Sequence, residues 1–176
     1  AAFGPDRIEE GRDVDGIASF ADLAKMPHML IAGATGSGKS VTIHALINSL
    51  LFRNGPDSLR FVMVDPKRVE LTLYNGIPHL LTPVITDSKK AILALKWTIN
   101  EMERRYTVLE EKHVRDISSY HSSVLAPALD KRDSREEGVD LPETMPYIVV
   151  VVDELADIMS TYPRELEAGI VRLAQM

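Results

Sequence analysis

Eight consecutive residues in the first quarter of the chain have the types and spacing that bind phosphate. They read Gly33-Ala34-Thr35-Gly36-Ser37-Gly38-Lys39-Ser40 and fit the pattern G-x-x-x-x-G-K-S/T. Glycines let the backbone turn sharply and let phosphates come close, and the N–H groups of such a loop converge on an anion. The motif predicts a phosphate-binding loop in which Lys39 reaches the β- and γ-phosphates and the Ser40 hydroxyl binds Mg²⁺.

Two adjacent acids near the end of the chain could supply the remaining chemistry. Asp153 and Glu154 directly follow an apolar run over residues 147–152. We expect Asp153 to support the Mg²⁺ ion through water and Glu154 to orient and deprotonate the attacking water, as a general base. Neighbours on an extended chain point to opposite sides, which favours separate roles. The simpler alternative is that both acids only cap the next helix.

These residues need parallel strands and helices to hold them. Residues 29–32, 60–65 and 147–152 are short apolar runs typical of buried parallel strands, and the last is β-branched enough for a central strand. A helix is predicted after the loop from the spacing of Ile43, Leu46, Ile47, Leu50 and Leu51. We therefore expect an α/β core with a mostly parallel sheet and helices on both of its faces.

Sequence patterns further along the chain predict one more strand and two more helices of the same core. Residues 80–86 suit a short edge strand because Pro83 disfavours a central one. A long helix begins near Ser88, capped by Thr86 or Asp87, and covers one face of the sheet. Its apolar stripe consists of Ile92, Leu95, Ile99, Met102, Tyr106 and Leu109. We expect a final helix from Glu165 to Met176 whose inward-facing residues are Leu166, Ile170 and Leu173.

The expected organisation is a lead-in segment over residues 1–27 and one core over residues 28–176. The lead-in suits turns, a small hairpin within residues 11–20 and one helical turn over residues 21–25. Residues 127–146 are expected to form a mobile surface loop, because residues 130–138 contain no apolar side chain.

Other chemically capable residues are weaker candidates. Lys67 could contact phosphate or a neighbouring subunit, or pair with Glu70. Arg104 and Arg105 could serve a neighbour's nucleotide, although pairing with acids is the commoner role. We expect Trp97 to pack beside the apolar stripe. The histidines show no metal-ligand spacing; they are His28, His44, His79, His113 and His121.

Composition narrows the class of protein. With 45% hydrophobic and 26% charged residues, the 176-residue chain is typical of one globular domain. The net charge of −6 excludes a uniformly basic surface that coats nucleic acid, although a local basic loop stays possible. Cysteine is absent, which excludes disulfides and thiolate chemistry and suits a cytoplasmic location. No apolar run approaches the roughly 18 residues of a membrane span.

Several further segments follow one another in a recognisable order. They are residues 22–33, Asp65-Pro66-Lys67 with Glu70-Leu71, residues 76–80, residues 100–106, Asp153-Glu154-Leu155-Ala156-Asp157, and residues 172–175. Together they resemble the motor domain of FtsK/SpoIIIE-type DNA translocases, and the resemblance covers about residues 11–122 and 145–176.

The resemblance implies a RecA-like P-loop ATPase core that forms hexameric rings around double-stranded DNA and moves it during chromosome partition and cell division. It implies that ATP and Mg²⁺ bind at Gly33, Ala34, Thr35, Gly36, Ser37, Gly38, Lys39, Ser40 and Val41. Ser40 and Asp153 would then hold the metal, with Glu154 and Lys39 as catalytic residues.

The family's sensor strand, arginine finger, DNA-contacting loops and membrane anchor have no counterpart in these 176 residues, so the resemblance implies a partial motor with weak activity of its own. Two alternatives remain: a ring ATPase of a protein-secretion system, and a nucleotide-binding assembly module without turnover.

Overall fold

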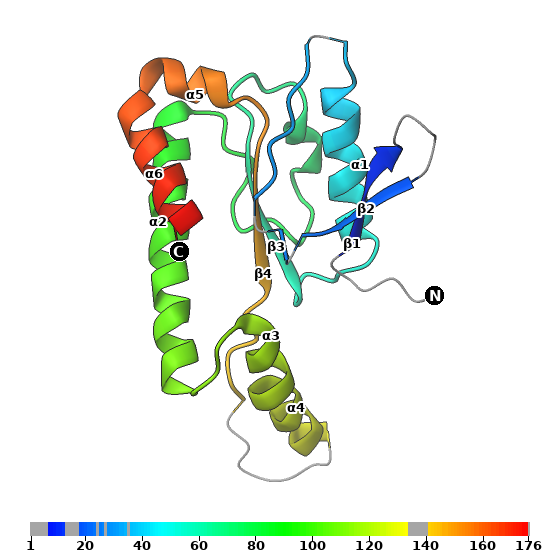
Figure 1. Cartoon of the computed structure of the whole chain (residues 1–176), viewed down its shortest axis with the longest axis vertical. Helices are drawn as coiled ribbons and strands as arrows, with labels where there is room; N and C mark the ends of the chain where they lie inside the picture. The colour runs from blue at the N-terminus through cyan, green and yellow to red at the C-terminus, as the bar shows by residue number, and fades with distance from the viewer. Residues whose placement is uncertain are drawn as a thin grey trace.

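The computed structural model describes residues 7–12, 18–23, 25–26, 28–34, 36–133 and 141–175 (Figure 1). An antiparallel hairpin of β1 (Arg7–Arg12) and β2 (Ala18–Asp22) comes first. The central sheet follows, made of β3 (Leu59–Val64) and β4 (Tyr147–Val152). Within the described ranges no helix is both long and apolar enough to cross a membrane.

Helices pack on both sides of the central sheet. The phosphate-binding loop leads into α1 (Lys39–Leu51), and the short 3₁₀ helix η1 (Leu71–Tyr74) follows β3. The long α2 (Ser88–Glu111) precedes a group formed by α3 (Ile117–Tyr120), the π-helical turn η2 (His121–Leu125) and α4 (Ala126–Asp133). After β4 come α5 (Leu155–Thr161) and α6 (Pro163–Gln175).

Strands β3 and β4 are parallel and in register from Leu59 opposite Tyr147 to Val64 opposite Val152. The parallel pairing places the carboxyl ends of both strands, and therefore Asp65 and Asp153, at one edge of the sheet. The edge strand expected over residues 80–86 is reduced to two parallel bridges, Phe61 with Leu80 and Val64 with Ile85. Pro83 lies between the two bridges and has no N–H to donate, which explains the interruption.

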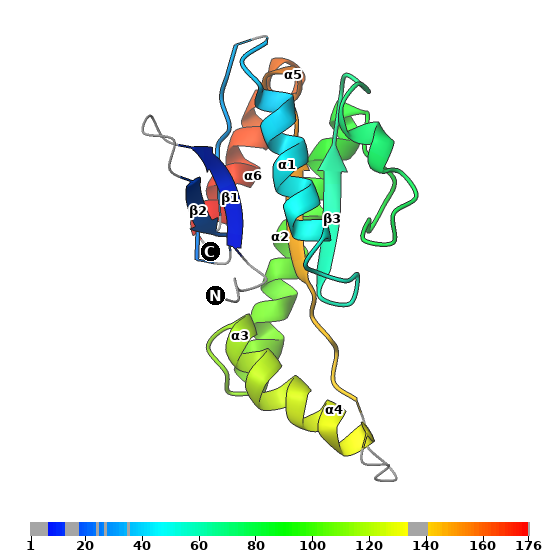
Figure 2. The same cartoon turned by 90° about the vertical axis from the view of Figure 1, so that its right-hand side faces the viewer.

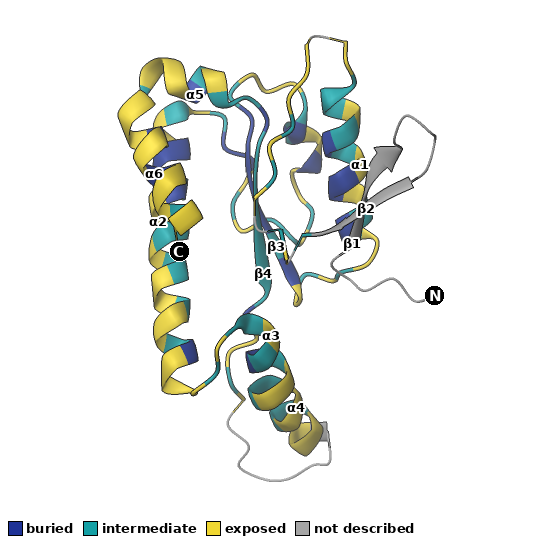
Figure 3. Cartoon of the chain, viewed as in Figure 1, coloured by how far each residue is buried: buried dark blue, intermediate teal, exposed yellow. Residues whose placement is uncertain are grey.

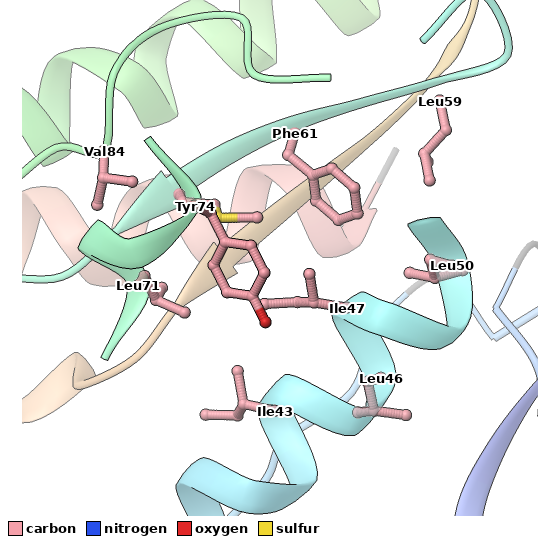
Figure 4. Close-up of a cluster of buried hydrophobic side chains, with 10 residues drawn as sticks. Ile43, Leu46, Ile47, Leu50, Leu59, Phe61, Leu71, Tyr74 and Val84 are labelled. Carbon is pink, nitrogen blue, oxygen red and sulfur yellow. The ribbon is translucent and has the colours of Figure 1, made fainter. Parts of the chain in front are cut away.

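Alternate side chains of β3 pack into two separate hydrophobic cores, one on each face of the sheet. Phe61 and Met63 pack toward α1 and η1, together with Leu46, Leu50 and other residues of α1 (Figure 4). Val62 and Val64 pack toward α2, α5 and α6. The views in Figures 1 and 3 show the resulting layers, with α1 on one side of the sheet and α2 with α6 on the other. The predicted α/β architecture is confirmed.

Helix α2 begins where the sequence predicted. The Asp87 carboxylate accepts a hydrogen bond from the Lys90 backbone N–H and caps the helix. In α6, Leu166 is fully buried as expected, but the inward position of Ile170 was wrong because its side chain is 39% exposed. Gly169 faces the core instead, where a Cβ would lie 3.8 Å from the Leu95 side chain, so α6 approaches α2 closely there.

Three predictions about the segments that precede the loop had different outcomes. The small hairpin is confirmed, although its turn over residues 13–17 lies outside the described residues. The helical turn over residues 21–25 was wrong, because Asp22 still pairs with Arg7 in the hairpin. The strand over residues 29–32 was also wrong: Met29 and Ile31 pack on the core beside α1, but Leu30 is 79% exposed and the segment pairs with no strand.

The absence of that strand explains the exposure of β4. Its six residues are only partly buried, whereas the sequence predicted a strand buried on both faces. Among the described residues β4 pairs with β3 alone, so its other edge has no neighbouring strand.

The loop expected over residues 127–146 is partly helical. Residues 126–133 form α4, because Ala128 and Leu129 favour helix and Lys131 and Arg132 complement the negative end of the helix dipole. The wider π turn η2 ends two residues before Pro127, which cannot donate to the preceding turn. Figure 2 shows this group of helices extending away from the sheet. Residues 134–140 lie outside the described residues, and mobility of the segment stays a prediction.

Candidate nucleotide-binding and catalytic site

The phosphate-binding loop has a backbone shape that depends on its glycines. Gly36 and Gly38 have φ angles of 81° and 93°, in the left-handed region that side chains other than glycine rarely adopt. A Cβ on Gly33 would overlap the Ser37 hydroxyl oxygen. The Ser37 N–H donates to the Ala34 carbonyl at 2.9 Å and closes the turn. Thr35, another predicted binding residue, lies outside the described residues.

Helix α1 begins at Lys39, immediately after the loop. Gly38 is its N-cap and provides no side-chain hydrogen bond to the first helical N–H groups. Those donors and the positive end of the helix dipole are suited to an anion held by the loop. Val41, in the first turn, is 72% exposed.

Lys39 links the loop to the acids at the end of β4. Its ammonium group donates to the backbone carbonyl of Asp153 at 2.9 Å. It also lies 3.4 Å from Asp153 Oδ1 and 3.4 Å from Glu154 Oε2. The fold therefore brings Lys39 to two predicted site residues that lie more than a hundred positions further along the sequence.

Asp153 is nearly buried and incompletely satisfied. Its side chain is 5% exposed, and no hydrogen bond reaches its Oδ1 atom, so the Lys39 ammonium provides the compensating charge. The Asp153 backbone N–H donates to Val64 and continues the ladder between β3 and β4. A buried carboxylate oxygen without a hydrogen bond is available to a cation or to its bound water.

The charges of the site shift two pKa values in opposite directions. Partial burial works to lower the pKa of Lys39, but the carboxylates of Asp153 and Glu154 outweigh it and raise that pKa above 10.5. Burial works to raise the pKa of Glu154, but the ammonium groups of Lys39 and Lys67 outweigh it and lower that pKa below 4.5. Glu154 is therefore a carboxylate and Lys39 an ammonium at neutral pH.

Ser40 makes a contact that the motif did not predict. Its hydroxyl donates to Glu70 Oε1 at 2.9 Å. The other oxygen of Glu70 lies 3.3 Å from His44 Nε2, and His44 Nδ1 lies 2.9 Å from the Tyr74 hydroxyl. Asp65, at the end of β3, is fully buried and accepts the backbone N–H groups of Glu70 and Leu71. Two features of the sequence pointed to this segment: the position of Asp65 after an apolar strand, and the resemblance of Asp65-Pro66-Lys67 with Glu70-Leu71 to the family.

The weaker candidates have structural partners. Lys67 lies 3.5 Å from Glu154 and 3.8 Å from Asp157, so its acidic partners are not Glu70, which was one of the three alternatives. Contact with phosphate or with a neighbouring subunit stays a prediction. Arg104 and Arg105 both pair with Glu101, which agrees with the commoner role for such arginines.

Two further predictions concern Trp97 and the histidines. Trp97 is 44% exposed. At 3.6 residues per turn it lies on the side of α2 away from the apolar stripe, so its expected position beside the stripe was wrong. In the part of the chain that the structure describes, no cluster of acids and histidines that could hold a metal occurs.

The residues of this site fit a nucleoside triphosphate with a hard cation. A Cβ at Gly33 would displace the Ser37 hydroxyl, the start of α1 has uncapped donors, and Lys39 provides positive charge. The Ser40 hydroxyl and Asp153 Oδ1, which has no hydrogen bond within the described residues, are oxygen ligands of the kind that Mg²⁺ prefers.

A family model and the curated relatives of this chain agree on one family. A model of the FtsK/SpoIIIE family matches residues 5–176. The chain is 52% identical over 166 residues to the DNA translocase SpoIIIE of Bacillus subtilis (strain 168) and 47% identical over 183 residues to the DNA translocase FtsK of Agrobacterium fabrum. Each alignment covers 94% of this chain and 20% of the relative, so the chain spans about a fifth of the length of these curated relatives.

Solved structures show the same fold. The pCW3 conjugation coupling protein TcpA, in a monomer form with ATPgS, matches 98% of this chain and 43% of its own, with a TM-score of 0.67 and 30% identity. The cytoplasmic domain of the Type VII secretion ATPase EccC of Thermomonospora curvata matches 97% of this chain and 20% of its own, with a TM-score of 0.63 and 28% identity.

Fold and site together define an incomplete RecA-like α/β core of the P-loop ATPase class. Within that class, this chain belongs to the FtsK/SpoIIIE family.

Proposed function

We propose that this chain is the ATP-binding and ATP-hydrolysing part of a motor that moves double-stranded DNA. The observation that carries the proposal is the position of the Lys39 ammonium, 3.4 Å from carboxylate oxygens of both Asp153 and Glu154. Phosphate binding and water activation would then occur at one point of the sheet edge. The choice of DNA as the substrate is supported by the 52% identity to a protein described as a DNA translocase.

The binding residues have distinct roles in this proposal. The loop from Gly33 through Ala34, Thr35, Gly36, Ser37 and Gly38 surrounds the phosphates with backbone N–H groups, and Lys39, Ser40 and Val41 add the first N–H groups of α1. Ser40 and Asp153 hold Mg²⁺, Asp153 through water. The bound ion would neutralise charge on the phosphoryl oxygens.

Glu154 is the proposed general base. It is ionised at neutral pH, because Lys39 and Lys67 lower its pKa. A γ-phosphate competes for the same Lys39 ammonium, since a lysine that contacts phosphate no longer pairs fully with Glu154. The loss of this partner moves the pKa of Glu154 back toward its ordinary value and makes it a stronger base. Lys67, 3.5 Å away, keeps the carboxylate oriented.

Two variants of the chain test these roles. Lys39→Ala removes the phosphate contact, and we expect nucleotide binding to be lost or nearly lost. Glu154→Gln keeps the shape of the side chain and removes the base, so it should bind a fluorescent ATP analogue normally and lose turnover. Normal turnover by Glu154→Gln would show that another residue is the base.

The other proposed properties are those of a ring motor: a cytoplasmic homo-oligomer, of six subunits in the complete assembly, that encircles DNA. A protein-secretion ATPase is the main alternative, because EccC shares the fold at 28% identity. A nucleotide-binding assembly module is the non-enzymatic alternative. Dependence of the ATPase rate on DNA separates the first from the second, and any turnover excludes the third.

A further inference from the structure

Glu70 is a carboxylate beside the proposed metal ligand that the phosphate-binding motif does not include. It lies just before η1, on the segment that follows β3, and its side chain is 30% exposed. Its Oε1 atom accepts the Ser40 hydroxyl at 2.9 Å. In the part of the chain that the structure describes, this contact connects the start of α1 with the end of β3.

The chemistry of the two groups fixes the direction of this hydrogen bond. A carboxylate can only accept, so the single proton of the Ser40 hydroxyl points toward Glu70. The lone pairs of the hydroxyl oxygen then face away from Glu70 and are free for a cation. Without an acceptor at this position the hydroxyl would rotate, and its proton could occupy the direction that a metal ligand needs.

Glu70 is itself held by a chain of side chains. Its Oε2 atom can only accept, so the His44 Nε2–H group is the donor at 3.3 Å. His44 Nδ1 in turn lies 2.9 Å from the Tyr74 hydroxyl. Tyr74 is 5% exposed and lies between η1 and α1 (Figure 4). The position of Glu70 is therefore tied to the packed core.

The backbone of this segment is fixed independently. The buried Asp65 carboxylate accepts the N–H groups of Glu70 at 3.0 Å and Leu71 at 2.9 Å. Arg68 has a φ of 60°, an unfavourable conformation for a residue other than glycine, and its N–H donates to the Asp65 carbonyl at 3.2 Å. A strained turn that is held by a buried acid keeps one geometry, and strain of this kind is concentrated at functional sites.

We propose that Glu70 is a positioning residue that orients the Ser40 hydroxyl for the divalent cation, with His44, Tyr74 and Asp65 as its supports. This inference rests on the proposed function, because it assigns Ser40 the cation. Residues that orient a metal ligand from outside the coordination sphere typically change metal affinity about 10- to 100-fold when they are replaced.

The test measures the binding of a fluorescent ATP analogue to the chain as a function of Mg²⁺ concentration. Glu70→Met has similar length and no acceptor, and we expect it to raise the Mg²⁺ concentration for half-maximal effect about 10- to 100-fold. Glu70→Ala is a second variant without an acceptor, in case the methionine disturbs folding. Glu70→Gln retains a carbonyl oxygen for Ser40 and should stay within about threefold of the wild type.

A double variant separates orientation from charge. In a Ser40→Ala background there is no hydroxyl to orient, so Glu70→Met should add no further effect. Glu167, an exposed glutamate on α6, provides the control Glu167→Met, which should match the wild type.

Three results would overturn the inference: an unchanged Mg²⁺ requirement in Glu70→Met, a Glu70→Gln variant as weak as Glu70→Met, or an undiminished effect of Glu70→Met in the Ser40→Ala background. A wild-type chain that binds no nucleotide, or a Lys39→Ala variant that binds normally, would instead contradict the proposed function.

Discussion

The contact between Lys39 and Asp153 should stabilise the nucleotide-free protein measurably. Two unit charges 3.4 Å apart attract by about 5 kcal/mol at an effective dielectric constant near 20. The cost of removing both groups from water offsets part of this, since the side chains are only 20% and 5% exposed. Lys39 also interacts with Glu154, so removal of Asp153 leaves the ammonium with one carboxylate partner. We therefore expect a coupling free energy of about 1–3 kcal/mol between Lys39 and Asp153.

The measurement is a double-mutant cycle with Lys39→Met, Asp153→Asn and the combined variant. The free energy of unfolding comes from urea denaturation without nucleotide, at pH 7 and about 0.1 M salt. Lys39→Met alone should cost about 2–3 kcal/mol, because it leaves the Asp153 carboxylate buried without a counter-charge.

A surface ion pair provides the matched control. Arg172 and Glu103 form a contact of 2.8 Å with side chains 54% and 48% exposed, so the same cycle should give less than about 1 kcal/mol there. Effects of Lys39→Met and Asp153→Asn that add within about 0.5 kcal/mol would refute the reasoning. Such additivity would mean that the two groups do not interact in the free protein.

Two further predictions concern the phosphate-binding loop and the ion pairs of Glu101 with Arg104 and Arg105 on α2. Gly33→Ala should weaken nucleotide binding, because its Cβ would force the Ser37 hydroxyl to turn away and would lie 3.2 Å from the Ser37 Cβ. Gly55→Ala, with open space around it, should bind normally. Isothermal titration with ATP checks both variants. Glu101 should make stability depend on pH, because hydrogen bonds from Arg104 and Arg105, against the opposing effect of burial, lower its pKa from 4.5 to about 2. A carboxylate with a depressed pKa contributes fully above the unfolded value near 4.5, and its contribution is lost as pH falls toward 2. The shift corresponds to about 3 kcal/mol at most, and to about 1–2 kcal/mol after solvent screening by the exposed arginine. Urea denaturation at pH 5 and pH 3 should therefore show a steeper loss for the wild type than for Glu101→Gln, and equal losses would disprove the assignment.

The sequence predicted those elements whose signal is local. The glycine spacing of the loop, the capped start of α2 at Ser88 and the β-branched run of β4 each depend on neighbouring residues, and each was confirmed. The juxtaposition of Lys39 with Asp153 and Glu154 could also be anticipated, because phosphoryl transfer needs the phosphate-binding lysine and the acids at one site.

Features that depend on distant partners could not be predicted in the same way. Residues 29–32 have the composition of a strand, but a strand also needs a neighbour to pair with, and composition does not report one. Ile170 lies on the exposed side of α6 and Gly169 on the side that faces Leu95 of α2, and this orientation depends on how the two helices meet. The contact of Glu70 with Ser40 joins residues 30 positions apart through the path of the turn after β3, which no spacing rule describes.

The most direct test of the proposed function is the effect of double-stranded DNA on the ATPase rate, measured with this chain in the protein that carries it. We predict that DNA stimulates the rate and that the stimulation declines steeply as salt rises, because a translocase contacts mainly the phosphates of DNA. Glu154→Gln should abolish both the basal and the stimulated rate. An active ATPase whose rate is indifferent to DNA at low salt would contradict the account and favour a motor that moves protein.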